Sequence, residues 1–181
     1  MVLRIADFDP ALHDRSGFCS GVSSIDNFLK LTAKKQQNAD MVRVRVMTED
    51  ASNIVQGYYV LNAHSIDAGE LPVEIGRKAP QHRQVPAAYI SMIGVDLTAQ
   101  GKGLGSVLLA NALRQILNAS KLVATAVVIL DILDDADADA MARRERYYKR
   151  FGFAELPGQR RRLILPMALA KIIADELAEP A

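Results

Sequence analysis

A glycine-rich stretch between a strand-like and a helical segment constrains the fold of this chain more than any other feature. The stretch spans residues 100–105 (QGKGLG) and follows the apolar segment 87–95. Apolar residues after it have the spacing of a buried helical face: Leu109, Ala112, Leu113, Ile116 and Leu117. Glycines allow a ligand close to the backbone, and the first turn of a helix has unpaired N–H groups. The sequence therefore predicts a strand, a turn and a helix N-terminus that together bind an anion such as phosphate.

Two other phosphate-binding motifs are excluded by their spacing. A Walker A loop reads G-x-x-x-x-G-K-[ST], and no such sequence is present. A dinucleotide fingerprint reads G-x-G-x-x-G near the start of a βαβ unit, whereas Gly101, Gly103 and Gly105 give G-x-G-x-G in the middle of this chain. The glycine-rich turn therefore belongs to neither class.

A different spacing, Q-x-x-G-x-G, does fit, with Gln100, Gly103 and Gly105 at its fixed positions. Further along, residues 147–153 (YYKRFGF) contain a Y-x-x-x-G-F sequence. Both motifs, in this order, resemble those of the GNAT superfamily of N-acetyltransferases, in which the glycine-rich loop binds the pyrophosphate of acetyl-CoA. An ordinary tight turn explains the glycines alone but does not account for the second motif.

Strand-like and helical segments alternate along the chain, which favours an α/β (α+β) architecture. We expect a helix from Ser23, with Ser23 as N-cap and Asp26 in a box-like arrangement, and a loop with short helical turns over residues 62–86. Further helices are expected over residues 143–150 and 167–177. Strands are expected over residues 2–5, 41–47, 54–61, 87–95, 123–130, 151–155 and 163–165.

The resemblance implies a GNAT fold, in which a mixed, mostly antiparallel central sheet is split by a V-shaped cleft and flanked by helices. The cleft would open where the strand over residues 87–95 diverges from the strand over residues 123–130. A length of 181 residues is typical of one domain. We therefore expect residues 1–181 to form a single GNAT acetyltransferase domain.

The resemblance also implies acetyl-CoA as the co-substrate and no metal. The pantetheine arm would lie along residues 87–95 like an added strand, bonded to the backbone of Ile93 and Val95. The diphosphate would lie on N–H groups of residues 102–106. A plain core strand also explains Ile93 and Val95, and the two interpretations are compatible. The predicted acetyl-CoA site comprises Ile93, Gly94, Val95, Gln100, Gly101, Lys102, Gly103, Leu104, Gly105 and Ser106.

Tyr148, four residues before Gly152 in the second motif, is the candidate catalytic residue. It would lie at the end of the helix that flanks the cleft, where its phenol can protonate the departing CoA thiolate when an amine attacks the acetyl carbonyl. Tyr147, one helical step away, would point elsewhere, into the core. A half-buried aromatic side chain in ordinary packing is the alternative interpretation of Tyr148.

No convincing general base is evident in the sequence. His64 and His82 lie in the segment that we expect to be a loop, and both are interpreted as non-catalytic. A base is not strictly required, because an α-amine with a pKa of about 8 is already partly neutral at cytosolic pH.

Two further segments, residues 18–29 (FCSGVSSIDNFL) and 56–59 (QGYY), resemble the toxin branch of the GNAT superfamily. Enzymes of that branch acetylate the amino acid on charged tRNA and are neutralised by an antitoxin protein, so the resemblance implies an aminoacyl-tRNA and an antitoxin as partners. Two features depart from the branch pattern. Met92 stands where a basic residue is common, and residues 131–141 (DILDDADADAM) are longer and more acidic than the usual connection.

Basic residues are segregated along the chain although the formal net charge is only +1. Residues 143–162 contain eight basic and two acidic side chains, and Lys30, Lys34 and Lys35 cluster at the end of an expected helix. A tRNA would need such groups for phosphate contacts. A solvated surface, with contacts to the phosphates of CoA, is the alternative interpretation.

The remaining features set the cellular context and leave the acceptor open. The single cysteine, Cys19, excludes an internal disulfide, and no signal peptide or membrane-spanning run is evident, so we expect a soluble cytoplasmic protein without a membrane partner. A homodimer is the default assembly. The alternatives to a toxin are a housekeeping acetyltransferase for a small-molecule or protein amine and a non-catalytic acetyl-CoA-binding module. The module would be expected to lose the glycines or the tyrosine.

Overall fold

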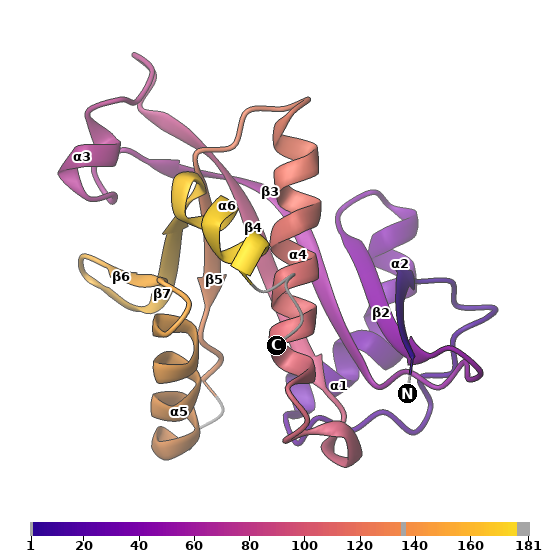
Figure 1. Cartoon of the computed structure of the whole chain (residues 1–181). Coiled ribbons are helices and arrows are strands. Elements are labelled where there is room, and N and C mark those ends of the chain that lie inside the picture. Colours follow the sequence, from indigo (N-terminus) through magenta and orange to yellow (C-terminus); the bar gives the residue numbers. More distant parts are fainter. Residues whose placement is uncertain (1, 135–136, 177–181) are drawn as a thin grey trace. The chain divides into compact units, whose positions relative to one another are not determined.

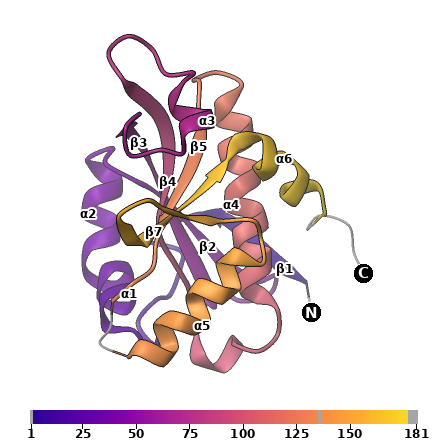
Figure 2. The same cartoon turned by 90° about the vertical axis from the view of Figure 1, so that its left-hand side faces the viewer.

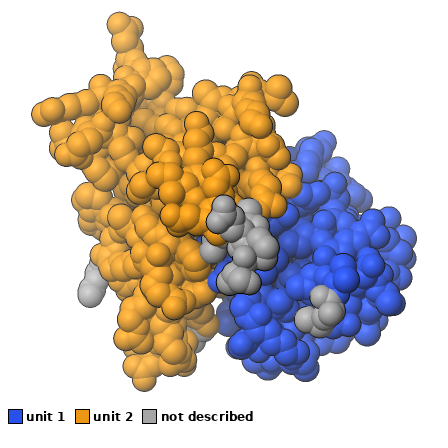
Figure 3. All heavy atoms as spheres, in the orientation of Figure 1, with its two compact units in different colours: residues 1–62, 91–112 blue, residues 63–90, 113–181 orange. Residues whose placement is uncertain are grey.

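A computed structural model describes residues 2–134 and 137–176 of the protein. The chain forms two compact units, which have different colours in Figure 3. Unit 1 contains residues 1–62 and 91–112, and unit 2 contains residues 63–90 and 113–181. Two strands and one helix continue from one unit into the other. The single domain that the sequence predicts stays a prediction.

The described residues form a seven-stranded sheet with the order β1-β2-β3-β4-β5-β7-β6 (Figure 1). The ladders β1·β2, β2·β3, β5·β7 and β6·β7 are antiparallel, and β4·β5 is parallel. The expectation of a mixed, mostly antiparallel sheet is therefore confirmed. The strands are β1 (Leu3–Asp7), β2 (Arg43–Glu49), β3 (Gly57–Asp67), β4 (Gln84–Val95), β5 (Val127–Asp131), β6 (Ala154–Leu156) and β7 (Gln159–Pro166).

Helices connect the other consecutive strands, whereas β2 joins β3 and β6 joins β7 without a helix, and α6 follows β7 directly (Figure 2). The described α-helices are α1 (Ser23–Asn27), α2 (Ala33–Asn38), α3 (Val73–Gly76), α4 (Leu104–Ser120), α5 (Ala138–Lys149) and α6 (Met167–Glu176). A π-helical turn, Phe28–Thr32, joins α1 to α2, and a 3-10 turn, Leu97–Ala99, precedes the glycine-rich stretch. None of the helices described is both long and apolar enough to cross a membrane.

Two neighbouring tyrosines of β3 hold helices against the strands of unit 1. Tyr58 and Tyr59 are fully buried, and consecutive residues of a strand point to opposite faces. The hydroxyl of Tyr58 donates to the carbonyl of Ile25 in α1 at 2.7 Å, and its ring stacks on that of Phe28. The hydroxyl of Tyr59 donates to Oδ1 of Asn111 in α4 at 2.6 Å. Each hydroxyl is thus buried with a partner, as burial of a polar group requires.

Branched apolar side chains form the core of unit 2. The run that suggested a central strand is buried throughout Val127–Asp131 except at its last residue. The half-buried Ile75 of α3 packs against this core. Full burial of each such side chain contributes about 1.5–3 kcal/mol to stability. The buried members are Ile66, Ala68, Leu71, Val85, Ala87, Val127, Ile129, Leu156 and Ile164.

The structure corrects the expected bounds of two segments, the loop over residues 62–86 and the strand from Val123. The expected loop 62–86 is shorter than predicted, because β3 extends to Asp67 and β4 begins at Gln84. Polar side chains interrupt the apolar pattern of β3 without ending the strand, whereas residues 68–83 contain the expected short helical turn, α3. The strand expected from Val123 begins only at Val127. Val123 itself is 72% exposed, so its apolar character carries no information about the strand.

The expected helix starts are also corrected. Val22, not Ser23, is the N-cap of α1, and Oδ1 of Asp26 accepts hydrogen bonds from the N–H and hydroxyl of Ser20 instead of closing a capping box. Helix α5 begins at Ala138, five residues before the expected start, because the side chain of Asp137 accepts from the N–H of Ala140 at 2.9 Å. At the other end of the chain, the expected last helical residue, 177, lies outside the described residues.

Gly94 of β4 is required by packing within unit 1. A Cβ at this position would lie 2.6 Å from Cγ2 of Ile25. We therefore expect Gly94→Ala to lower the free energy of unfolding by about 1–3 kcal/mol, the usual cost of overpacking. Urea denaturation followed by circular dichroism measures the change. Gly17→Ala is the control, because a Cβ at Gly17 meets no atom within 4 Å. Equal stability of the two variants would contradict the packing argument.

Candidate active site

The glycine-rich turn leaves backbone open to solvent at the start of α4. Gly101 and Gly103 have φ values of +77° and +76°, which glycine adopts without strain. A Cβ at either position would have no heavy atom within 4 Å, so the space beside both residues is clear. The buried Leu104 begins α4, where the N–H groups of Ser106 and Val107 donate to the carbonyl of Gly103, at 3.0 and 3.4 Å. These features fit a diphosphate that approaches the main chain.

The side chain of Gln100 anchors this turn within unit 1. Its Nε2 donates to the carbonyls of Ser20 and Val95, at 3.0 Å each. Nearby, the carboxylate of Asp96 accepts from the N–H of Cys19 at 2.8 Å and from the N–H and hydroxyl of Thr98. Burial alone would raise the pKa of Asp96, but these hydrogen bonds and the charge of Lys30 lower it. The glutamine of the motif therefore orients the loop through hydrogen bonds to the backbone.

Strand β4 continues beyond its ladder with β5. The register joins residues 87–90 to residues 127–130 and ends at the pair Ile90 and Leu130. From Ser91 to Val95, β4 presents an edge with no described partner in β5. The predicted pantetheine contacts at Ile93 and Val95 fall in this part of the strand. The carbonyl of Val95 already accepts from Gln100, which leaves its second lone pair and its N–H for a ligand on that edge.

Two residues near this edge have packing roles that the sequence did not reveal. Gly94 is buried against Ile25, as described above, so its lack of a side chain has a structural reason. Met92, the departure from the toxin-branch pattern, lies with its sulfur 3.5 Å from the hydroxyl of Tyr58. A thioether is a weak acceptor and suits this partly buried position.

Tyr148 lies in the last turn of α5 and is buried, with 9% of its surface exposed. Its ring meets those of Tyr147 and Phe153 edge-on, with centroids 5.2 and 6.0 Å apart. Burial, together with Tyr147, raises the pKa of the phenol, and the cation of Arg144 opposes the shift. The phenol therefore keeps its proton over the neutral range and can act as a donor.

The expectation that Tyr147 points into the core is wrong. Tyr147 is half-buried, its ring contacts that of Phe151, and the guanidinium of Arg150 lies 5.4 Å from its centroid. Tyr148 is the buried member of the pair. The helical step of about 100° separates the two side chains, but α5 has too few apolar residues to indicate which one faces inward.

A polar cluster lies at the end of β5 in unit 2. The guanidinium of Arg162 in β7 donates two hydrogen bonds to the carboxylate of Asp131, at 2.8 Å each. The hydroxyl of Tyr89 in β4 donates to the same carboxylate at 2.8 Å. Burial and this hydrogen bond raise the pKa of Tyr89 to about 12. The ring of His64 in β3 lies 5.6 Å from that of Tyr89. The sequence analysis missed this cluster because its members are far apart in the chain.

The predicted site residues divide between the two units. The ten residues predicted for acetyl-CoA, all within residues 93–106, belong to unit 1. Tyr148 belongs to unit 2, as do Tyr89, Asp131 and Arg162. The described residues contain no group of three or more His, Cys, Asp or Glu side chains that could hold a metal ion.

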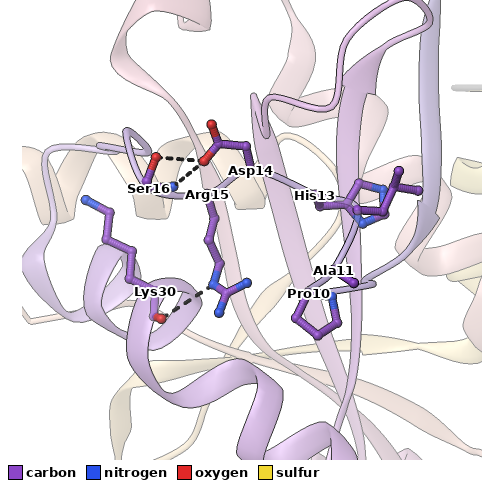
Figure 4. A pocket seen from close by; sticks show the side chains of 8 residues that line it. Pro10, Ala11, His13, Asp14, Arg15, Ser16 and Lys30 are labelled. Atoms are coloured by element: carbon purple, nitrogen blue, oxygen red, sulfur yellow. Dashed lines mark hydrogen bonds between the residues drawn. The ribbon is translucent and has the colours of Figure 1, made fainter.

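Unit 1 also has a cleft of about 460 Å³ that contains none of the predicted site residues (Figure 4). Arg15 bridges one side of it, because its Nε donates to the carbonyl of Lys30 at 3.4 Å. On the rim, the carboxylate of Asp14 accepts from the N–H and hydroxyl of Ser16, which lowers its pKa. These contacts give the loop between β1 and α1 its shape.

Several basic residues are held in ion pairs, including two from the segment 143–162 that suggested a tRNA surface. Arg161 pairs with Asp134 at 2.5 Å, and Arg162 is committed to Asp131. Arg43 and Arg45 of β2 pair with Asp40 and Asp7, respectively. Three other basic side chains, in α5 and at its C-cap, are exposed to solvent. Their i, i+3 and i+7 spacing places them on one helix face: Arg143, Arg146 and Arg150.

Comparison with known proteins places this fold in a family. No family model matches the chain. It is 43% identical over 164 residues to a probable toxin TacT of Sinorhizobium fredii (strain NBRC 101917 / NGR234), which covers 91% of each protein. It is 29% identical over 173 residues to a tRNA-acetylating toxin of Mycobacterium tuberculosis (strain ATCC 25618 / H37Rv), which covers 96% of this chain and 95% of the relative.

Solved structures have the same fold. A Tyr-to-Phe mutant of KacT has a TM-score of 0.84 at 24% identity, over 94% of this chain and 98% of KacT. AtaT complexed with acetyl-methionyl-tRNAfMet has a TM-score of 0.83 at 23% identity, over 95% and 99%. The protein therefore has the fold of these two solved structures. Since the likeness to TacT extends over nearly the whole chain, the protein belongs to the family of acetyltransferase toxins that includes TacT.

Substitution of Gly103 tests the predicted diphosphate site. Valine at this position would be strained at a φ of +76° and would fill the clear space beside the backbone. We expect Gly103→Val to weaken acetyl-CoA binding at least about tenfold, measured by calorimetry, while circular dichroism remains native. Gly158→Val is a matched control, because Gly158 has a φ of +77° and equally open surroundings in the turn between β6 and β7. If folded Gly103→Val bound acetyl-CoA with unchanged affinity, the prediction that the diphosphate binds at this turn would be wrong.

Proposed function

We propose that this protein transfers the acetyl group of acetyl-CoA to the α-amine of an aminoacyl-tRNA and thereby acts as the toxin of a toxin–antitoxin pair. The observation that carries the proposal is the 43% identity to TacT over 91% of both chains. A second relative, aligned over 96% of this chain, is named a tRNA-acetylating toxin. A structurally similar protein, AtaT, has been solved with acetyl-methionyl-tRNAfMet, which is the product of such a transfer.

The residues proposed to hold acetyl-CoA act mainly through their backbone. The backbone of the turn around Gly101 and Gly103, together with the N-terminal end of α4, would receive the diphosphate. The edge of β4 at Ile93 and Val95 would pair with the amide groups of pantetheine. AtaT has been solved with bound acetyl-CoA, which supports this assignment. When bound, acetyl-CoA supplies the activated acetyl group as a thioester.

Tyr148 is proposed as the acid that protonates the departing sulfur. Its buried phenol has a raised pKa, so it carries its proton at neutral pH and can donate it as negative charge develops on the thiolate. The nearby cation of Arg144 favours the phenolate that remains. KacT and AtaT have also been solved as Tyr-to-Phe mutants.

The tRNA itself would supply most of the binding energy through its phosphates. Arg143 and Arg146 on the exposed face of α5, with Arg150 at its C-cap, provide three cations close to the helix that also carries Tyr148. An α-amine needs little activation, because a good part of it is neutral near its pKa of about 8. We place this reaction in the cytoplasm, where charged tRNA is available.

An antitoxin protein is the proposed partner. AtaT has been solved with the C-terminus of the antitoxin AtaR, and a KacTA–DNA complex is also known. Binding of such a protein to the toxin would block acetylation until the antitoxin is lost. The homodimer suggested by the sequence stays a prediction.

The proposed role of Tyr148 predicts a selective loss of turnover in Tyr148→Phe. Only the hydroxyl is removed, so the ring contacts with Tyr147 and Phe153 and the affinity for acetyl-CoA should remain. We expect kcat to fall roughly 10²-fold or more, the usual scale for a general acid. Steady-state acetylation assays measure kcat, and single-turnover assays isolate the chemical step.

Tyr147→Phe is the matched control on the same helix. It also loses one phenolic hydroxyl, but from a half-buried ring that stacks with Phe151 and Arg150, so its effect on kcat should be several-fold at most. If both variants kept equal, near-native rates, Tyr148 would not be the acid, and another group would have to protonate the thiolate.

The proposed acceptor predicts a strong dependence on salt and on the charge of α5. The double variant Arg143→Glu and Arg146→Glu should raise KM for charged tRNA about tenfold or more and leave acetyl-CoA affinity unchanged, because phosphate contacts set tRNA affinity. KM of the unaltered protein should rise steeply with salt for the same reason. Lys121→Glu with Lys171→Glu, which reverses two exposed charges outside α5, is the control.

Labelled acetyl-CoA incubated with total charged tRNA tests the acceptor directly. The proposal predicts label in an N-acetyl amino acid that is released from tRNA by mild base. Acetylation of a small amine under the same conditions, with no label on tRNA, would show that the acceptor proposal is wrong while the acetyltransferase activity stands.

A further inference from the structure

Two cations of the cleft in unit 1 form no ion pair with any described residue. Arg15 and Lys30 line this cleft, and both are half-buried. By contrast, the paired arginines of β2 and β7 lie 2.5–2.9 Å from a carboxylate oxygen. Lysine and arginine side chains are rarely withdrawn from solvent without a partner. The two cations therefore indicate that an anionic ligand enters the cleft.

The guanidinium of Arg15 is held in place from two sides, although its charge has no counter-ion. Its Nε donates to the carbonyl of Lys30 at 3.4 Å, and its Cζ lies 5.0 Å from the centroid of the buried Phe8 ring. Lys30 belongs to the π-helical turn Phe28–Thr32, and such turns are frequent at functional sites. In the view of Figure 4, the guanidinium lies between Lys30 and Pro10. Its two terminal nitrogens donate to no described acceptor, so both can bind a ligand.

The imidazole of His13 supplies a third donor to the cleft. Its Nδ1 accepts from the N–H of Asp9 at 2.9 Å, so the ring proton is on Nε2. His13 lines the cleft with only 7% of its surface exposed, and its Nε2 has no acceptor among the described residues. In that part of the chain, Oδ1 of Asn62 is the one fully buried side-chain N or O atom without a partner, so Nε2 of His13 is not sealed from the cleft. A ligand oxygen can therefore accept this hydrogen bond.

The charge of the lining favours a ligand with one negative charge. Besides Arg15 and Lys30, the lining contains one acid, Asp14. Hydrogen bonds from the hydroxyl and N–H of Ser16 lower the pKa of Asp14, so this carboxylate stays ionised at neutral pH. Two cations and one carboxylate leave a net charge of +1. A phosphodiester carries one negative charge, whereas a phosphomonoester carries nearly two at neutral pH. The lining therefore suits a backbone phosphate of a nucleic acid better than a free phosphate.

The arrangement of the donors suits a phosphate better than a carboxylate. A carboxylate pairs best with one guanidinium through two parallel hydrogen bonds, but the Nε side of Arg15 is already engaged. In Figure 4, Arg15 and Lys30 lie toward one end of the lining and His13 toward the other. Donors from different directions match the tetrahedral oxygens of a phosphate. The volume of about 460 Å³ is typical of ligand pockets, and the apolar side chains of Pro10 and Leu12 offer a wall for the attached sugar or base.

We propose that this cleft binds a backbone phosphate of the acceptor tRNA, for which Arg15 and Lys30 supply the charge and His13 a hydrogen bond. This inference rests on the proposed function for the identity of the RNA. The charge of Lys30 also acts on the carboxylate of Asp96, which precedes the glycine-rich turn in the same unit. A phosphate in the cleft would thus anchor the RNA to the unit that contains the proposed acetyl-CoA turn.

Lys30→Gln tests the cleft through the salt dependence of binding. The variant should raise Kd for fluorescently labelled, deacylated tRNA about three- to tenfold, and the slope of log K against log salt should become shallower by about 0.7–0.9, because one phosphate contact releases fewer counterions. Fluorescence anisotropy at several salt concentrations measures both. Lys30→Arg should restore them. Arg4→Gln, which removes an exposed cation of β1 in the same unit, is the control and should leave the slope unchanged. Native affinity and slope in Lys30→Gln would overturn the proposal.

Arg15→Gln tests the second cation and should have the same effect on Kd and on the salt slope. This substitution also removes the bond to the carbonyl of Lys30 and the contact with Phe8, so a thermal melt accompanies the binding assay. Lys30→Gln keeps the proposal testable if Arg15→Gln fails to fold, because the ammonium of Lys30 makes no described hydrogen bond.

Other anions are tested against the same variants. Inorganic phosphate, adenosine monophosphate and an acidic peptide of Asp and Glu are titrated into the unaltered protein and Lys30→Gln by calorimetry. Binding of tRNA that depends on Lys30 and is tighter than that of all three supports the proposal. If one of the small phosphates or the peptide binds in a Lys30-dependent way and tRNA does not, the cleft is a site for that ligand, and the inference for RNA is overturned.

Acetylation of charged tRNA by the unaltered protein distinguishes failure of this inference from failure of the proposed function. If tRNA binds with a Lys30-dependent salt slope but is not acetylated, the proposed function fails and the cleft remains an RNA site. If tRNA is acetylated but Lys30→Gln binds it with unchanged Kd and slope, the proposed function stands and the cleft is not part of the RNA interface.

Discussion

The short parallel ladder between β4 and β5 is the constraint on which the rest of the candidate site depends. Pairing ends at Ile90 and Leu130, yet β4 continues to Val95. The backbone groups beyond the last pair form a strand edge, and such an edge binds another extended chain through its N–H and C=O groups. A ladder along the whole of β4 would occupy the edge that we propose for the pantetheine arm. The same ending places Tyr89 and Asp131 beside the last pair, where polar side chains replace the apolar core.

The ion pair of Asp131 and Arg162 joins β5 to β7 at this ending, and the hydroxyl of Tyr89 ties β4 to the same carboxylate. Removal of one member of such a partly buried pair leaves an uncompensated charge, which costs several times more than loss of an exposed pair. Arg162 is therefore unsuited to hold a phosphate, although it lies in the most basic part of the sequence. Exposed cations that do not hold the fold together, such as Arg143 and Arg146, are better candidates for that contact.

Conformational and packing requirements account for different glycines of the candidate site. Gly101 and Gly103 have positive φ and clear space beside them, so a backbone that a ligand can approach explains their identity. Gly94 has neither property and is instead fixed by its contact with Ile25. The sequence cannot distinguish a glycine required by its backbone conformation from one required by packing, because the residue is glycine in both cases. The distinction matters for mutagenesis, since a change at Gly94 alters stability as well as any ligand contact.

The sequence by itself determined the family, the strand–turn–helix around Gly103 and the mixed sheet, because each depends on local spacing or on contiguous motifs. The same motifs predicted Tyr148 as the acid, which stays a prediction. The sequence did not determine that Tyr148 rather than Tyr147 is buried, that β3 extends past Asn62 and His64, or that Arg162 is bound to Asp131. Those facts depend on contacts between residues far apart in the chain, such as Tyr89 with Asp131, and local patterns carry no record of them. Tertiary structure alone therefore decided which polar side chains find hydrogen-bond partners and which, like Oδ1 of Asn62, have none among the described residues.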